Sequence, residues 1–224
     1  MMLDATYSAR TLQRAGQWDA ALALLPGGAE TAALRAELLV DRHTWRLDPV
    51  DEALDAVRSL GDPHSGTAAL LTAQLEYYRR LFNLGGPALC ADPVEAFAGL
   101  PPTAWSVFWW SVAQENLLQD KDAAAEGLAR ARALAAAEGD RLVESYAVRH
   151  QGGLLFFEKG DHQRGLPLLR RSLQLRAACG ARPQVAASQM TLAEALGPGE
   201  EGDELREIAA GTAEELGLTW LKAA

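Results

Sequence analysis

Glycine and proline divide this chain into twelve stretches that each have the length of a short or medium α-helix. Strong helix formers fill these stretches: Ala and Leu supply 79 of the 224 residues, whereas the β-branched Ile and Val supply only 10. Since strands favour β-branched residues, the sequence predicts an all-α fold. The predicted helices cover residues 3–15, 17–25, 28–43, 49–60, 65–83, 93–99, 102–118, 120–138, 140–158, 161–178, 182–196 and 202–216.

Local signals mark where several of these helices begin and end. Asp48-Pro49 and Asp92-Pro93 each predict an N-cap Asp followed by Pro at the first helical position. Glycine can close a helix because it adopts the left-handed conformation without a Cβ clash. The connections are mostly short, so successive helices are expected to pack as antiparallel hairpins. The glycines predicted to end helices are Gly16, Gly61, Gly160, Gly180, Gly197 and Gly217.

Two stretches, residues 12–25 and 152–173, share one pattern at the junction of two helices. In each, a Gly is followed by an acid or amide, an aromatic or His, two further residues and a small residue. This pattern resembles the tetratricopeptide repeat, a helical hairpin. The resemblance implies that Gly153 is the small contact residue and Phe156 the aromatic residue of one first helix. It assigns the small, large and small positions of the following helix to Gly165, Leu169 and Ser172.

The small residue of each second helix measures the repeat along the chain. Its spacings are 32, 43, 28, 41 and 40 residues, around the family period of about 34. The resemblance therefore covers a single domain, 1–224, and implies a right-handed solenoid of about six antiparallel hairpins. The later repeats are similar to the long-period arrays of large bacterial transcriptional regulators. The small residues are Ala21, Ala53, Ala96, Ala124, Gly165 and Leu205, and the hairpins cover 3–25, 28–60, 65–99, 102–138, 140–178 and 182–216.

A solenoid of this kind has a concave groove, which the resemblance implies is lined by the first helices and accepts a peptide or a partner helix. Aromatic and Arg side chains are enriched at binding hot spots, and the predicted first helices carry several of them. The peptide-clamp subclass of the family grips a terminal carboxylate with Lys, Arg and Asn, and the full set is not found here. The groove candidates are Arg42, Trp45, Tyr78, Trp109, Trp110, Asn116, Arg149 and His150.

Some of these candidates have a structural alternative. Trp105, Phe108, Trp109 and Val112 recur at the spacing of a core-facing stripe, which favours a packing role for most of them. Trp110 falls off that stripe and is the best single anchor if it is exposed in the groove. For Arg149 and His150 the alternative is a solvated helix face.

Charge and motifs argue against several classes of protein. The net charge of -9 and a pI near 5.0 disfavour nucleic-acid binding. No run of 18 apolar residues and no signal-like N-terminus is present, so a cytoplasmic protein without membrane contact is expected. The search for catalytic and nucleotide-binding motifs finds none, so we expect no enzyme, metal or cofactor. Cys90 and Cys179 are expected to be buried. The four His residues are scattered along the chain: they are His43, His64, His150 and His162, and the last takes the place of the repeat's usual aromatic.

Three hypotheses for function follow. The first is a non-catalytic scaffold that holds a protein or peptide partner in the groove. The second is a regulatory module in which a small molecule or signalling peptide closes the superhelix, and it requires a deep polar pocket with perturbed side chains. The third is self-association, for instance as a homodimer, and it predicts exposed apolar surface on the last pair and on Trp220 and Leu221.

Overall fold

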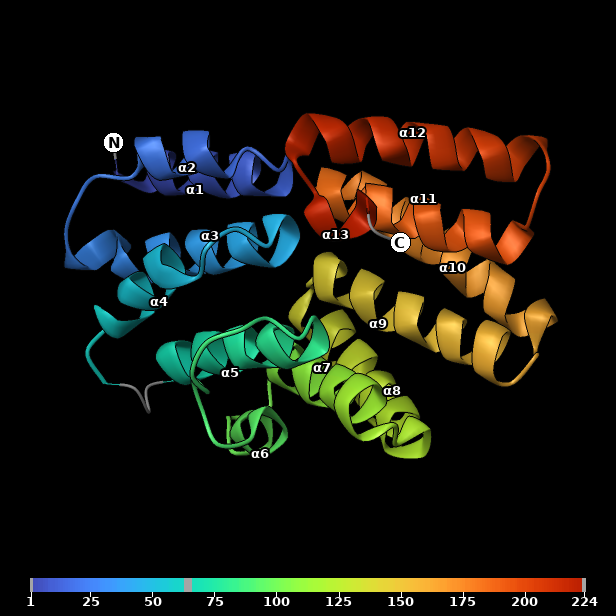
Figure 1. The fold of residues 1–224 in the computed structure, drawn as a ribbon, viewed down its shortest axis with the longest axis horizontal. Helices are drawn as coiled ribbons and strands as arrows, with labels where there is room; N and C mark the ends of the chain where they lie inside the picture. The colour runs from blue at the N-terminus through green and yellow to red at the C-terminus, as the bar shows by residue number, and fades with distance from the viewer. Residues whose placement is uncertain (1, 63–65, 223–224) are drawn as a thin grey trace.

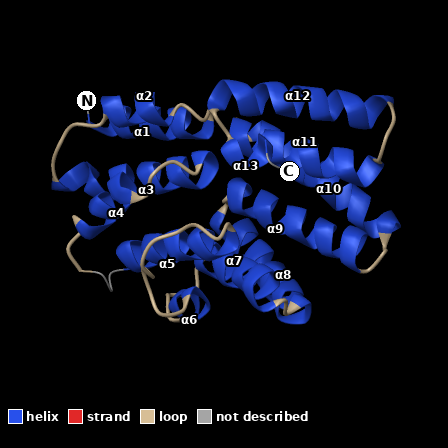
Figure 2. Ribbon diagram, viewed as in Figure 1, coloured by secondary structure: helices blue, strands red, loops and turns tan. Residues whose placement is uncertain are grey.

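The computed structural model describes residues 2–62 and 66–222, and within these ranges the chain forms thirteen α-helices, two π-helical turns and no strand (Figure 1; Figure 2). The all-α prediction is thus confirmed for the described residues, none of whose helices has the length and apolar character needed to span a bilayer. The elements are α1 (Met2–Arg14), α2 (Trp18–Leu24), α3 (Ala29–Arg46), α4 (Asp51–Arg58), α5 (Gly66–Leu81), α6 (Pro93–Ala98), α7 (Ala104–Ala113), η1 (Gln114–Leu118), α8 (Lys121–Glu138), α9 (Arg141–Gly153), η2 (Leu154–Glu158), α10 (His162–Ala178), α11 (Arg182–Leu196), α12 (Glu200–Leu216) and α13 (Thr219–Lys222).

Each of the twelve predicted ranges contains a helix in its described part, although residue 65 and His64 lie outside the described residues. Two features were not predicted. The helices expected at 102–118 and 140–158 end in the π-helical turns η1 and η2, in which hydrogen bonds span five residues instead of the four of an α-helix. The short α13 follows Gly217, and its Leu221 is buried among other helices, a tertiary contact that no local pattern reveals.

The predicted helix starts have different outcomes. Asp92 caps α6, since its carboxylate accepts a hydrogen bond from the Val94 N–H at 2.9 Å and Pro93 is the first helical residue. The prediction for Asp48 is wrong, because α4 begins only at Asp51. Asp48 instead pairs with the Arg42 guanidinium at 3.0 Å, which draws it away from the helix end. The six glycines predicted to end helices all have positive φ, between 65° and 89°.

The hairpin of α9 and α10 is closed by a tight contact between two glycines and large side chains. A Cβ on Gly165 would lie 2.8 Å from the backbone nitrogen of Phe156, so only Gly fits there. On the first helix the close contact is made by Gly152, where a Cβ would lie 3.0 Å from Leu169. Gly153, the residue expected at this position, meets nothing closer than 4.0 Å. The register implied by the resemblance is therefore wrong by one residue on this helix.

The last hairpin also departs from the expected spacing. Leu205 is half-buried, whereas Gly202 is buried against the carbonyl oxygen of Gly197 at the start of α12. The small contact residue of this helix is thus Gly202, three positions earlier, since its backbone approaches the preceding turn too closely for a side chain. The rest of the series is small and largely enclosed: Ala21, Ala53, Ala124 and Gly165 are buried, and Ala96 is half-buried.

A buried carboxylate holds the long connection between α5 and α6. Glu76 is completely buried and accepts two hydrogen bonds of 2.8 Å from Arg79, one of 2.8 Å from Arg80 and one of 2.9 Å from the Leu89 N–H. Burial raises the pKa of Glu76, but these hydrogen bonds outweigh burial and lower the pKa to about 2. Glu76 therefore remains ionised and fastens residues 82–92 to α5.

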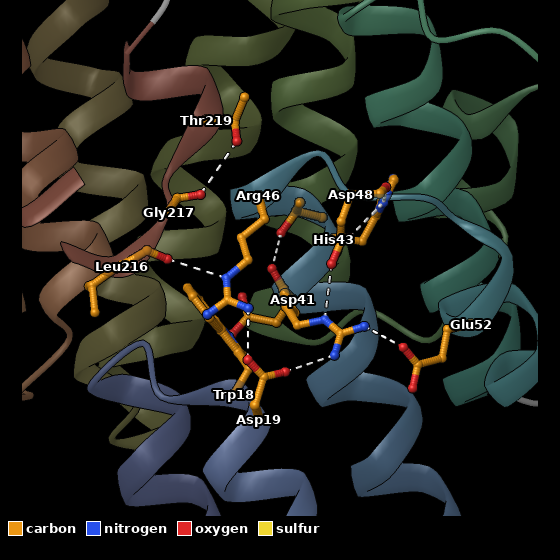
Figure 3. A network of polar contacts seen from close by, with 12 residues as sticks. Trp18, Asp19, Asp41, His43, Arg46, Asp48, Glu52, Leu216, Gly217 and Thr219 are labelled. Atoms are coloured by element: carbon orange, nitrogen blue, oxygen red, sulfur yellow. Dashed lines mark hydrogen bonds and ion pairs between the residues drawn. The ribbon is translucent and has the colours of Figure 1, made fainter. Parts of the chain in front are cut away.

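The helix pairs follow one another around the molecule until the last pair contacts the first (Figure 1). One hydrophobic cluster joins residues of α1, α2 and α3 to residues of α11, α12 and α13. At this terminal seam Arg46 of α3 donates from Nε to the Leu216 carbonyl at 3.2 Å and from its guanidinium to Asp19 at 2.8 Å (Figure 3). Trp45 stacks on Trp220 with a ring separation of 5.4 Å. The seam thus joins segments that lie at opposite ends of the sequence.

Candidate binding cavity

The first helix of every pair contributes to one cavity of about 470 Å³. Because the pairs curve round, their first helices face a common space, and side chains distant in sequence become neighbours. The cavity is lined by Arg10, Gln13 and Arg14 of α1, Glu37, Val40, Asp41, Thr44 and Trp45 of α3, Thr67, Leu70, Leu71, Gln74 and Tyr78 of α5, Trp105 and Trp109 of α7, Asp140, Leu142 and Tyr146 at the start of α9, and Gln184 of α11.

Aromatic rings form a continuous wall of this cavity. The rings of Tyr78 and Trp109 are 5.8 Å apart, those of Trp109 and Trp105 are 6.3 Å apart, and those of Trp105 and Tyr146 are 5.6 Å apart. Trp109 is only 9% exposed, and its buried indole N–H has no hydrogen-bond partner among the described residues. An unpaired buried donor costs free energy, so a ligand that accepts this hydrogen bond would recover some of that cost.

Asp41 of α3 brings a carboxyl group to the cavity lining. Its Oδ2 accepts hydrogen bonds from Trp18 Nε1 at 2.9 Å and Gln13 Nε2 at 3.1 Å, and its Oδ1 accepts one from Trp45 Nε1 at 3.2 Å. All three donors are electrically neutral. Burial raises the pKa of Asp41 by more than these hydrogen bonds lower it. Neutral donors therefore hold the carboxyl group in place, and the net effect of its surroundings is to disfavour the ionised form.

A buried cation lies behind the wall on the side of α11. Arg176 is 1% exposed, and its guanidinium stacks over the Tyr146 ring at 4.6 Å and donates to the Gln184 carbonyl at 2.8 Å. Among the described residues no carboxylate lies within 4 Å of it. The Gln184 side chain donates to the Tyr146 hydroxyl at 3.1 Å, while its own buried Oε1 accepts no hydrogen bond from the described part of the chain.

The predicted groove residues divide into two groups. Trp45, Tyr78 and Trp109 line the cavity, and so does Trp105, which the sequence pattern placed on the core-facing stripe. Five residues are not in the cavity lining: Arg42, Trp110, Asn116, Arg149 and His150.

Two residues of the second group pack elsewhere. Trp110 is half-buried between α7 and α8, so close to Gly127 that a Cβ on this glycine would lie 2.8 Å from the indole ring. Arg42 pairs with Asp19 at 2.9 Å, with Asp48 and with Glu52, at the edge of the terminal seam.

The other three residues form a polar cluster beside η1. His150 pairs with Glu115 at 2.8 Å, and the Asn116 side chain donates to the Tyr77 hydroxyl at 2.7 Å. Burial lowers the pKa of His150 more than Glu115 raises it. Arg149 donates to the Thr191 hydroxyl at 2.7 Å. This cluster connects α5, η1, α9 and α11 and is separate from the cavity lining.

The sequence analysis predicted none of the non-aromatic residues of the cavity lining, and Asp41 and Gln184 are two examples. Asp41 had a usable signal, since it precedes Trp45 by four residues and so lies on the same face of α3. Gln184 had no such signal, because its role depends on the approach of α11 to α9.

The expected burial of the two cysteines is also wrong: Cys90 and Cys179 are free thiols and only half-buried.

Fold and cavity together define an all-helical protein of successive helix pairs arranged around an aromatic-lined cavity. In the described ranges no three His, Cys, Asp or Glu side chains are grouped in a way that could hold a metal ion. Comparison of the chain with protein-family models, with curated proteins and with solved structures finds no match.

Proposed function

We propose that this chain is a non-catalytic binding protein that holds a small molecule or a short peptide in the cavity between its first helices. The observation that carries the proposal is the convergence of all six first helices on that one space. Its volume of about 470 Å³ falls within the range of small-ligand sites, roughly 300–1,000 Å³. A protein partner would enter it by a short terminal segment, since the ends of the array are joined at the terminal seam.

The proposal includes the architecture of a right-handed, tetratricopeptide-like superhelix of six hairpins in one domain. The close contact of Gly152 with Leu169 and of Gly165 with Phe156 supports it. So does the stacking of His162 on Phe156, with ring centroids 4.3 Å apart, at the place of the repeat's usual aromatic.

Ligand binding in this proposal is coupled to closure of the superhelix. Trp45 supports this coupling, because its ring lines the cavity and also stacks on Trp220 across the terminal seam. A ligand that contacts Trp45 interacts differently with the closed and the open arrangement, and only such a difference can shift their populations. This favours the regulatory module over a scaffold with a long open groove.

The test is a thermal-shift screen of a metabolite library and a short-peptide library against the purified protein. A hit is then measured with Leu70→Trp, which places a large ring in the cavity from α5. The matched control is Leu24→Trp, since Leu24 is 45% exposed on α2 and far from the lining set. We expect binding to be lost in the first variant and kept in the second. Hits that bind both variants equally, or chemical turnover of a hit, would contradict the proposal.

A further inference from the structure

The charges and rings of the cavity narrow the class of ligand. We infer that the cavity binds an organic cation, a primary ammonium group on an aromatic or apolar body, with the Asp41 carboxylate as its counter-ion and the rings of Trp45 and Tyr78 beside it. This inference rests on the proposed function and specifies the ligand of that same site.

Asp41 is the lining carboxylate that has neither an ion pair nor a helix-capping role, since its three hydrogen-bond donors are neutral side chains. Glu37 is paired with Arg10, and Asp140 caps α9 by accepting hydrogen bonds from two backbone N–H groups. In contrast, no Lys, Arg or His nitrogen of the described residues lies within 4 Å of the Asp41 carboxylate. Asp41 is half-buried, so an ionised carboxylate there is partly desolvated, and a ligand cation would supply the missing opposite charge.

The Asp41 carboxylate also has room for one more hydrogen bond. Its two oxygens offer about four acceptor positions, of which Trp18, Gln13 and Trp45 occupy three. Oδ1 carries only the hydrogen bond from Trp45, at 3.2 Å. An ammonium group beside Oδ1 would form a charge-assisted hydrogen bond, which is about twice as strong as a neutral one.

The aromatic wall suits the same ligand. The indole of Trp45 is hydrogen-bonded to Asp41, so a cation beside this carboxylate lies next to an aromatic ring. Cations are attracted to the faces of Trp and Tyr rings within about 6 Å. The apolar body of the ligand would cover the rings of Trp105 and Trp109 and the side chain of Leu70, which line the same space.

The arginines near the cavity do not favour an anion instead. Arg10 is already paired with Glu37, and Arg14 is exposed at the edge. Arg176 is covered by the Tyr146 ring and is 1% exposed, so it presents no N–H to the cavity. An anionic ligand beside Asp41 would therefore meet this carboxylate, and the lining cation without an ion pair in the described part of the chain, Arg14, is exposed to solvent, which screens its charge.

The ammonium group could come from a small amine or from the N-terminus of a peptide, and one set of probes distinguishes them. Phenethylamine, 2-phenylethanol and phenylacetate share a ring and differ in charge. Phe-Ala amide and its N-acetylated form test the peptide source. We expect phenethylamine to bind at least about tenfold more tightly than the alcohol, with phenylacetate the weakest, by titration calorimetry. A free Phe-Ala amide that binds more tightly than phenethylamine would assign the site to peptides.

Two variants locate the binding. Asp41→Asn should reduce the affinity for phenethylamine about tenfold and leave that for 2-phenylethanol within about threefold. Glu201→Gln, which removes an exposed carboxylate of α12 far from the cavity, is the charge-matched control and should change neither. Leu70→Trp should abolish the binding of every probe.

Each outcome decides the inference. Equal binding of the three probes by the wild-type protein, or a preference for phenylacetate, overturns it even if Asp41→Asn fails to fold. Failure of every probe to bind also overturns it. The proposed function survives either result if Leu70→Trp still blocks a library hit, and it fails separately if no ligand is sensitive to that variant.

Discussion

Removal of the Glu76 charge is expected to destabilise the protein strongly at neutral pH. In Glu76→Gln the shape of the side chain is kept, while Arg79 and Arg80 lose their shared counter-ion and the Leu89 N–H faces an amide. The pKa of Glu76 lies at about 2 in the folded protein against 4.5 for an unperturbed Glu. That difference corresponds to about 3 kcal/mol of folding free energy at pH 7.

The pH dependence has a definite sign. A carboxylate whose folded pKa is lowered stabilises the fold above its unfolded pKa, and the stabilisation is lost as the pH falls from about 4.5 towards 2. The stability difference between wild type and Glu76→Gln should therefore shrink from about 3 kcal/mol at pH 7 to about 1 kcal/mol near pH 3. Urea unfolding followed by circular dichroism at both pH values measures it.

The reasoning would be refuted by a loss below about 1 kcal/mol at pH 7, or by a difference that does not diminish in acid. Glu95→Gln is the matched control, because Glu95 is an exposed carboxylate on the neighbouring α6, and its stability should stay within about 0.5 kcal/mol of wild type at either pH.

Three other substitutions test separate parts of the fold. Arg46→Gln removes the hydrogen bond to Leu216 and should lower the free energy of unfolding by about 1–2 kcal/mol. It should also enlarge the radius of gyration measured by X-ray scattering. An unchanged radius would mean that the seam holds without Arg46. Gly152→Ala should lower the free energy of unfolding in urea by more than about 1 kcal/mol. Gly153→Ala should leave it unchanged or raise it by up to about 1 kcal/mol. The reverse order would restore the register that the sequence pattern implied. Trp110→Ala should cost about 2–4 kcal/mol, because the indole packs against α8; a loss of ligand binding at full stability would instead mark it as an anchor.

The sequence predicts the helices well because their signals are local. Asp92-Pro93 contains its own hydrogen-bond partner, the Val94 N–H, and so the capping pattern is sufficient. Asp48-Pro49 has the same residues, but Arg42, six residues earlier near the end of α3, pairs with the carboxylate. Whether an Asp caps a helix thus depends on a cation that the dipeptide does not reveal.

The cavity was only partly predictable for the same reason. Trp45, Tyr78 and Trp109 could be proposed from their residue type and their positions on first helices. Periodicity alone could not separate Trp109, which lines the cavity, from Trp110, which packs towards α8. The direction of each ring is decided by which neighbouring helix offers space, and Gly127 of α8 supplies space for Trp110 and for the Ser111 hydroxyl.

The terminal seam changes how an array of helix pairs is expected to fold. In an open array each pair contacts only its neighbours, so the ends fray and contacts stay local in sequence. Here the hydrogen bond from Arg46 to Leu216 spans 170 residues, and forming it incurs the entropy of closing a long loop. Once formed, the whole seam, with its hydrophobic cluster of α1, α2 and α3 against α11, α12 and α13, gives both end pairs a second neighbour and removes the free ends from which unfolding would begin. Destabilising α12 should therefore speed hydrogen exchange in α1 and α2, at the far end of the chain.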